Sequence, residues 1–111
     1  MNLNGRKFVM VSSTASAVDQ DSPTEFRYQE SDGVVWGSYS GDTVTHGHFV
    51  GTRDGELVAI SYVHALKAGG TAAGQSSSRI EAGNDGLLRL VEEFSFDGDD
   101  TVHVSVCREV G

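Results

Sequence analysis

Residues 33–64, "GVVWGSYSGDTVTHGHFVGTRDGELVAISYVH", decide the fold of this chain. Three strand-like runs, 34–40, 43–52 and 56–66, begin within this stretch and are rich in Val, Thr, Ile and aromatic residues. Gly41-Asp42 and Asp54-Gly55 separate these runs, and such pairs favour the positive backbone φ angles of hairpin turns. The stretch therefore predicts consecutive antiparallel strands.

The same pattern continues on both sides of this stretch. Further strand-like runs occupy residues 5–12, 25–30, 71–81, 87–96 and 101–109, and no segment has the 3.6-residue period of a helix. Residues 14–24 hold the single Pro and form the one long loop. Closing eight such strands removes the exposed edges. We therefore predict a single all-β domain over residues 1–111, an eight-stranded antiparallel up-and-down β-barrel, with a two-sheet β-sandwich as the alternative.

Composition limits the partners and the compartment of the protein. Its 111 residues carry a formal net charge of −8, which disfavours nucleic acids and anionic membranes as partners. Cys107 is the only cysteine, so an internal disulfide is impossible. The first residues lack the apolar core of a signal peptide, and no apolar run has the length that spans a bilayer. We expect a soluble, cytoplasmic protein.

Two-residue turns at 41–42 and 54–55 fix which side chains share a face. Trp36 then pairs with Gly47, and Gly47 pairs with Tyr62. The face with the large aromatic rings is predicted to be the interior, where rings cover the gap that a glycine leaves. It consists of Val34, Trp36, Phe49, Val58, Ile60, Tyr62 and His64, and the outer face of Val35, Tyr39, His46, His48, Ser61 and Val63.

His46 and His48 form a His-x-His pair of the kind that binds metals on a strand. The predicted neighbours on their face are Ser61, Val63 and Val35, none of which is a good ligand, and a metal site needs three or four. We therefore expect two solvated histidines and no metal. The sequence points to no other cofactor.

Glu92 is the one carboxylate predicted to lie on an apolar face. Leu88, Leu90, Phe94 and Phe96 share that face, and a buried carboxylate needs a polar partner. The length of the loop near residues 83–86 leaves two registers open. Arg79 faces Glu92 in one of them, whereas Gly74, Ser76 and Ser78 point inward in the other and supply hydroxyl groups.

The sequence contains no Walker loop, GxGxxG, HExxH, GxSxG or CxxC motif. The leading hypothesis is a small-ligand-binding or interaction barrel without catalytic activity. Its ligand contacts are predicted at Trp36, Tyr62, His64, Glu92 and Arg79. Two alternatives stay open, an enzyme that uses Glu92 and His64 as acid and base, and a structural homodimer subunit without a ligand.

Several motifs resemble those of a family of small bacterial proteins that are commonly labelled N-acetylglutamate synthase. They are "GVVWGSYSG" (33–41), "GHFVG" (47–51), "YVH" (62–64) and "DGLLRLVEEFSF" (85–96). The last departs from the family pattern at Leu87, Phe94 and Phe96, where the family has Arg, Trp and Trp. The resemblance implies a small β-barrel similar to lipocalins and streptavidin. The acetyl-CoA-binding pattern Q/R-x-x-G-x-G/A of acetyltransferases does not occur, so we expect no synthase activity.

Overall fold

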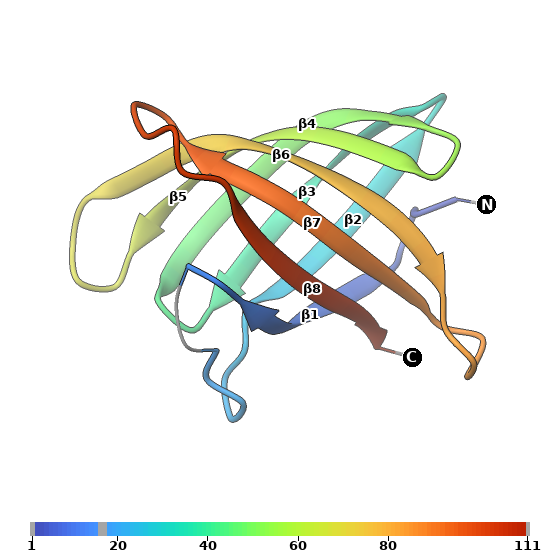
Figure 1. Ribbon diagram of the computed structural model, residues 1–111, viewed down its shortest axis with the longest axis horizontal. Helices are drawn as coiled ribbons and strands as arrows, with labels where there is room; N and C mark the ends of the chain where they lie inside the picture. The colour runs from blue at the N-terminus through green and yellow to red at the C-terminus, as the bar shows by residue number, and fades with distance from the viewer. Residues whose placement is uncertain (1, 16–17, 111) are drawn as a thin grey trace.

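The protein is a closed barrel of eight antiparallel strands in sequential order, with β8 returning to pair with β1 (Figure 1). The computed structural model describes residues 2–15 and 18–110. The predicted fold class and its up-and-down order are confirmed. The strands are β1 (Lys7–Ser13), β2 (Glu25–Ser31), β3 (Val34–Gly41), β4 (Val44–Asp54), β5 (Leu57–Leu66), β6 (Thr71–Ala82), β7 (Leu88–Phe96) and β8 (His103–Val110).

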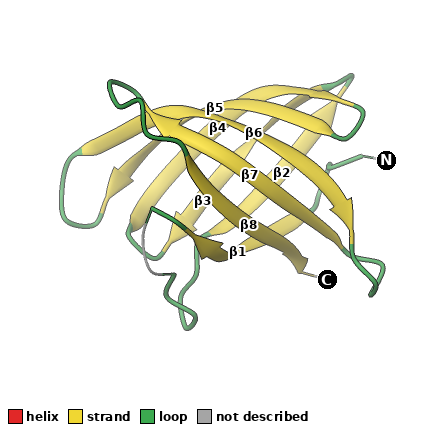
Figure 2. Ribbon diagram, in the orientation of Figure 1, coloured by secondary structure: helices red, strands yellow, loops and turns green. Residues whose placement is uncertain are grey.

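The described part of the chain consists of strands, turns and loops, as Figure 2 shows. It holds no helix that is long and apolar enough to cross a membrane. The β1–β2 loop and the β3–β4, β5–β6 and β7–β8 turns lie at one end of the barrel (Figure 1). The β2–β3, β4–β5 and β6–β7 turns lie at the other end, so the two ends are built from different parts of the sequence.

The prediction that Trp36 points into the barrel is wrong, because β4 carries a bulge at Thr45, close to the β3–β4 turn. The β3–β4 turn is Asp42-Thr43, one residue later than predicted, and the register shifts again between Tyr39 and Gly41. Thr45 and His46 of β4 both point outward, whereas β3 pairs with β2 without interruption, so the extra residue belongs to β4. The odd shift reverses the two faces of β3, so Val35 and Tyr39 are buried while Trp36 is 41% exposed. Val34 also lies outside.

The predicted faces of β4 and β5 are correct although their register is not. The turn lies at Gly55-Glu56, and Phe49 pairs with Tyr62 instead of Ile60. Because this shift is even, the alternation of inward and outward residues is preserved. Phe49, Val58 and Ile60 are buried in the core, as predicted, and His46 and His48 are exposed.

A plug formed by residues 2–6 closes the end of the barrel that carries the β2–β3 turn. The Leu3 side chain is fully buried, and its backbone N–H donates to Glu30 Oε1 at 3.0 Å. Arg53 binds both carboxylate oxygens of Glu30 at 2.7 Å. Arg6 donates to Glu109 at 2.8 Å, and Glu109 also accepts the Leu88 N–H. No local pattern in the sequence predicts this plug.

Gly55 occupies a turn position that strains other residues. Its φ is +61°, and a Cβ there would meet no atom within 4 Å. Because the cost is conformational only, we expect Gly55→Ala to lower the free energy of unfolding by about 1 kcal/mol. Urea denaturation measures this change, and an unchanged stability would contradict the turn conformation.

Candidate functional site

The barrel interior holds a cavity of about 110 Å³ at the end opposite the plug. Residues from the β1–β2 loop and the β3–β4 turn, including Ala15, Asp42 and Thr43, contribute to its lining and place its mouth at that end. The cavity extends inward to Ser76 and Glu92. It is therefore a cup with a rim of loop residues and a polar floor.

Aromatic rings from four strands form the wall of the cavity. Phe26 on β2 stacks on Tyr39 on β3, with ring centroids 5.0 Å apart. The ring centroids of Tyr62 on β5 and Phe96 on β7 are 6.1 Å apart, and those of Phe96 and Phe94 are 5.8 Å apart. All five rings line the cavity, so a ligand inside it would meet π faces and ring edges on most sides.

Tyr39 and His64 form a hydrogen-bonded pair in this wall. The distance from Tyr39 Oη to His64 Nδ1 is 2.7 Å. Burial lowers the pKa of His64 and raises the pKa of Tyr39. Both groups are therefore neutral at pH 7, and the wall carries polar atoms without a charge.

Glu92 forms the floor with three serine hydroxyl groups. Ser76 and Ser78 each donate to Oε2 at 3.4 Å, and Ser105 donates to Oε1 at 3.1 Å. Glu92 is 7% exposed. The pairing of Ser78 with Glu92 selects the second of the two predicted registers, and the predicted inward position of Glu92 is correct.

Burial raises the pKa of Glu92 above its ordinary value of 4.5, although the hydroxyl groups of Ser105, Ser78 and Ser76 oppose this shift. The folded state then binds the proton more tightly than the unfolded state does. The stability from this group is complete below pH 4.5 and is lost as the pH rises through the folded pKa.

We expect Glu92→Gln to remove this pH dependence, because an amide does not titrate and can still bond to hydroxyl groups. Urea denaturation of both proteins from pH 4 to about pH 8 checks it. The advantage of the variant over the wild type should grow with pH, and subtracting the two curves cancels the titration of Glu30 and His64. Parallel curves would show that Glu92 has the same pKa in both states.

Three of the five predicted ligand contacts, Tyr62, His64 and Glu92, line this cavity. Trp36 lies on the outer face because of the β4 bulge. Arg79 is exposed on β6, next to the inward Ser78, so the register with Arg79 inside is wrong. Neither residue lines the cavity. Phe26 was not predicted as a wall residue, and Tyr39 was predicted to lie on the outer face of the barrel.

His46 and His48 lie on the outer face of β4 with ring centroids 4.5 Å apart. Among residues 2–15 and 18–110, no group of three or more His, Cys, Asp or Glu side chains is placed to hold a metal ion. We expect elemental analysis of protein purified without a His-tag to find no stoichiometric zinc, nickel, copper or iron. One equivalent that disappears in the His46→Ala, His48→Ala double variant would contradict this expectation.

Glu92 and His64, the pair of the enzyme hypothesis, are not hydrogen-bonded to each other. Glu92 accepts from serine hydroxyl groups, and His64 bonds to Tyr39. Each group is held by its own partners, Glu92 at the floor of the cavity and His64 in its wall. Both still face the same cavity, so a ligand could contact the two at once.

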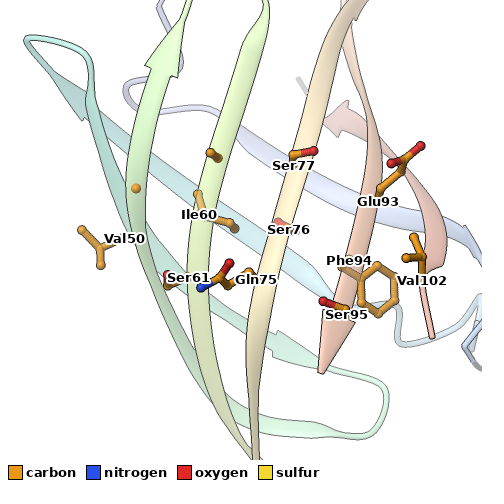
Figure 3. Close-up of a pocket in the computed structure, with 12 residues that line it drawn as sticks. Val50, Ile60, Ser61, Gln75, Ser76, Ser77, Glu93, Phe94, Ser95 and Val102 are labelled. Atoms are coloured by element: carbon orange, nitrogen blue, oxygen red, sulfur yellow. The ribbon is translucent and has the colours of Figure 1, made fainter. Parts of the chain in front are cut away.

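A second depression, a groove of about 450 Å³, lies on the outer face of the barrel over β4 to β7 (Figure 3). Val50 stands at one margin and Val102 at the other, and Ser61, Gln75 and Ser77 lie between them (Figure 3). The outward residues of β4, β5 and β6 in the ranges 46–52, 57–65 and 71–77 include no Asp, Glu, Lys or Arg. We call the outward surface of these three ranges the uncharged face; Glu93 on β7 lines the groove beside it.

A family model described as "Avidin-like protein" matches residues 1–110. No curated protein and no solved structure matches the chain.

Proposed function

Because this chain belongs to the avidin-like family, we propose that its barrel binds one small organic ligand in the interior cavity and catalyses no reaction on it. Avidin-like barrels are a family that binds small ligands. The observation that carries the proposal is the cavity itself, which opens at the end of the barrel opposite the plug and is floored by Glu92.

The size of the cavity limits the ligand. Drug-sized ligands occupy pockets of about 300–1,000 Å³, whereas this cavity measures about 110 Å³. It suits a molecule of about the size of a substituted benzene ring, or one end of a longer molecule whose remainder lies at the mouth. The aromatic wall supplies apolar contact, and the floor supplies orientation through hydrogen bonds.

A fragment screen by saturation-transfer NMR tests this proposal, with cationic, neutral and anionic fragments and biotin as probes. Ser76→Leu fills the cavity from its lining, and Ser77→Leu adds the same side chain to the outer face of the same strand. We expect some fragments to bind the wild type and Ser77→Leu but not Ser76→Leu. A screen in which no fragment distinguishes the two variants would refute binding in the interior.

We propose homodimer formation as a second role, which the uncharged face favours. Two copies of a chain with a net charge of −8 repel each other, and a contact surface without charged side chains keeps like charges from facing each other at close range. Light scattering coupled to size exclusion should give twice the 11.8 kDa of one chain, and Ser61→Glu should return it to one chain. A wild-type mass of one chain would refute the dimer.

We propose no N-acetylglutamate synthase activity for this chain. The strands occupy most of the chain, and the acetyl-CoA-binding pattern does not occur in the sequence. The hydrogen bonds of Glu92 and His64 to separate partners favour binding over acid–base catalysis.

A further inference from the structure

The carboxyl groups that line the cavity are not balanced by Lys or Arg among its described lining residues. The ionisable groups of its lining other than tyrosine are Glu92 at the floor, His64 in the wall and Asp42 at the mouth, and no Lys or Arg is among the described residues that line it. Two of the arginines, Arg53 and Arg6, pair with glutamates at the plugged end. A ligand inside the cavity therefore meets two carboxyl groups and no cationic side chain from Lys or Arg.

The loops around the mouth extend this imbalance. Residues 14–24, 42–43, 67–70 and 97–102 connect the strands at that end, and they contain six aspartates against one lysine, Lys67. The aspartates are Asp19, Asp21, Asp42, Asp97, Asp99 and Asp100. A mouth of one charge sign concentrates ligands of the opposite sign and speeds their entrance. This mouth favours cations.

The aromatic wall is also suited to a cation. The faces of aromatic rings are negative, and they attract ammonium and guanidinium groups within about 6 Å of the ring centroid. Phe26, Tyr39, Tyr62, Phe94 and Phe96 supply five such rings around one small space. An anion gains nothing from these faces.

The floor has room for one more hydrogen-bond donor. An ionised carboxylate has about four acceptor positions, and the described serines fill two on Oε2 and one on Oε1. The remaining position on Oε1 can accept an N–H group. A cation bound there would also favour the ionised form of Glu92, which its burial otherwise disfavours.

We infer that the cavity selects a small organic cation, a primary ammonium or amidinium group on an apolar body, with its N–H directed at Glu92 and its body against the aromatic wall. This inference rests on the proposed function, since it names the ligand class of the same cavity. It separates this ligand from neutral and anionic molecules of equal size.

Three probes of one shape test the inference: benzylammonium, benzyl alcohol and benzoate. Isothermal titration at pH 7 should show that benzylammonium binds the wild type at least about tenfold more tightly than benzyl alcohol, a difference of about 1.4 kcal/mol. Benzoate should bind more weakly than either. Added salt should weaken the binding of benzylammonium more than that of benzyl alcohol, because it screens the aspartates of the mouth.

Glu92→Gln tests the role of the floor, and Glu93→Gln is its matched control, because Glu93 is the exposed neighbour on the outer face of β7. The affinity ratio of benzylammonium to benzyl alcohol should fall about tenfold in Glu92→Gln and stay at the wild-type value in Glu93→Gln. The probe comparison on the wild type remains decisive if Glu92→Gln does not fold.

Each remaining outcome overturns the inference. Equal or tighter binding of benzyl alcohol or benzoate would overturn the choice of a cation and leave the proposed ligand-binding function standing. An unchanged ratio in Glu92→Gln would remove Glu92 from recognition. No binding of any of the three would also refute the inference, and the fragment screen with Ser76→Leu then decides separately whether the interior binds a ligand.

Discussion

Gly74→Ala is expected to lower the free energy of unfolding by about 3 kcal/mol or more, because the added methyl group has no free space. A Cβ on Gly74 would overlap the backbone carbonyl oxygen of Ser95 and lie 2.6 Å from Tyr62 Oη. The backbone of β6 or β7 must therefore move, and this movement strains the 2.7 Å hydrogen bond from Tyr62 Oη to the Ser95 carbonyl.

Urea denaturation measures this change, with Gly55→Ala as the matched control. Both variants add one methyl group to a glycine, but Gly55 has open space and only its φ angle opposes the change. The difference between the two variants isolates the steric overlap. Equal stabilities would show that the β6–β7 pairing adjusts to a side chain at position 74 without cost.

Arg53→Met is expected to cost about 2–4 kcal/mol, since removing one partner of a buried ion pair leaves the other charge unpaired. The Glu30 side chain is only 2% exposed, and Arg53 binds both of its oxygens. The estimate lies below the full cost of a buried pair because the Arg53 side chain is 16% exposed. Arg6→Met is the control and should cost about 1 kcal/mol or less, because that arginine is 36% exposed.

Acid should remove the effect of Arg53→Met. The hydrogen bond from Arg53 is the largest cause that lowers the pKa of Glu30 below 4.5. The stability from this group is complete above that value and is lost as the pH falls through the lower folded pKa. Chemical denaturation of the wild type and the variant should therefore give values that converge toward pH 2. If the difference in free energy of unfolding between the two proteins did not change with pH, the lost stability would come from packing of the aliphatic part of Arg53.

The strands were predictable because their signals are local. Alternating apolar residues and Gly-containing turn pairs mark each strand to within about two residues, and eight hairpin-linked strands leave closure as the way to satisfy both edges. The burial of Glu92 followed from its position between Leu90 and Phe94 on β7. The outward position of His46 and His48 was predicted correctly, because the observed β4–β5 register differs from the predicted one by an even number of residues. An even difference leaves each side chain on its predicted face.

The position of Trp36 was not predictable from local signals. One extra residue in β4, Thr45, shifts the β3–β4 register and reverses the predicted faces of β3, and the sequence around Thr45 does not mark this bulge. The same reversal placed Tyr39 outside and hid its partnership with His64. An error of one residue in a strand thus replaced a real wall residue by an exposed tryptophan.

The plug was missed for a different reason. Leu3 is one apolar residue among Asn2, Asn4 and Gly5, and nothing local indicates that it fills the end of a barrel. Its partners Glu30 and Arg53 lie far along the chain. Such contacts depend on the closed fold, so they become visible only when the barrel end is assembled.

The plug also determines how the molecule can be attached to a support. Asn2 and Val110 lie at the plugged end, because the plug begins at Asn2 and Val110 pairs with Lys7 next to it (Figure 1). A tether at either terminus therefore leaves from the side away from the mouth. A layer of molecules anchored by one terminus would therefore turn their cavity mouths toward the solution. A ligand could then enter each cavity without passing the support.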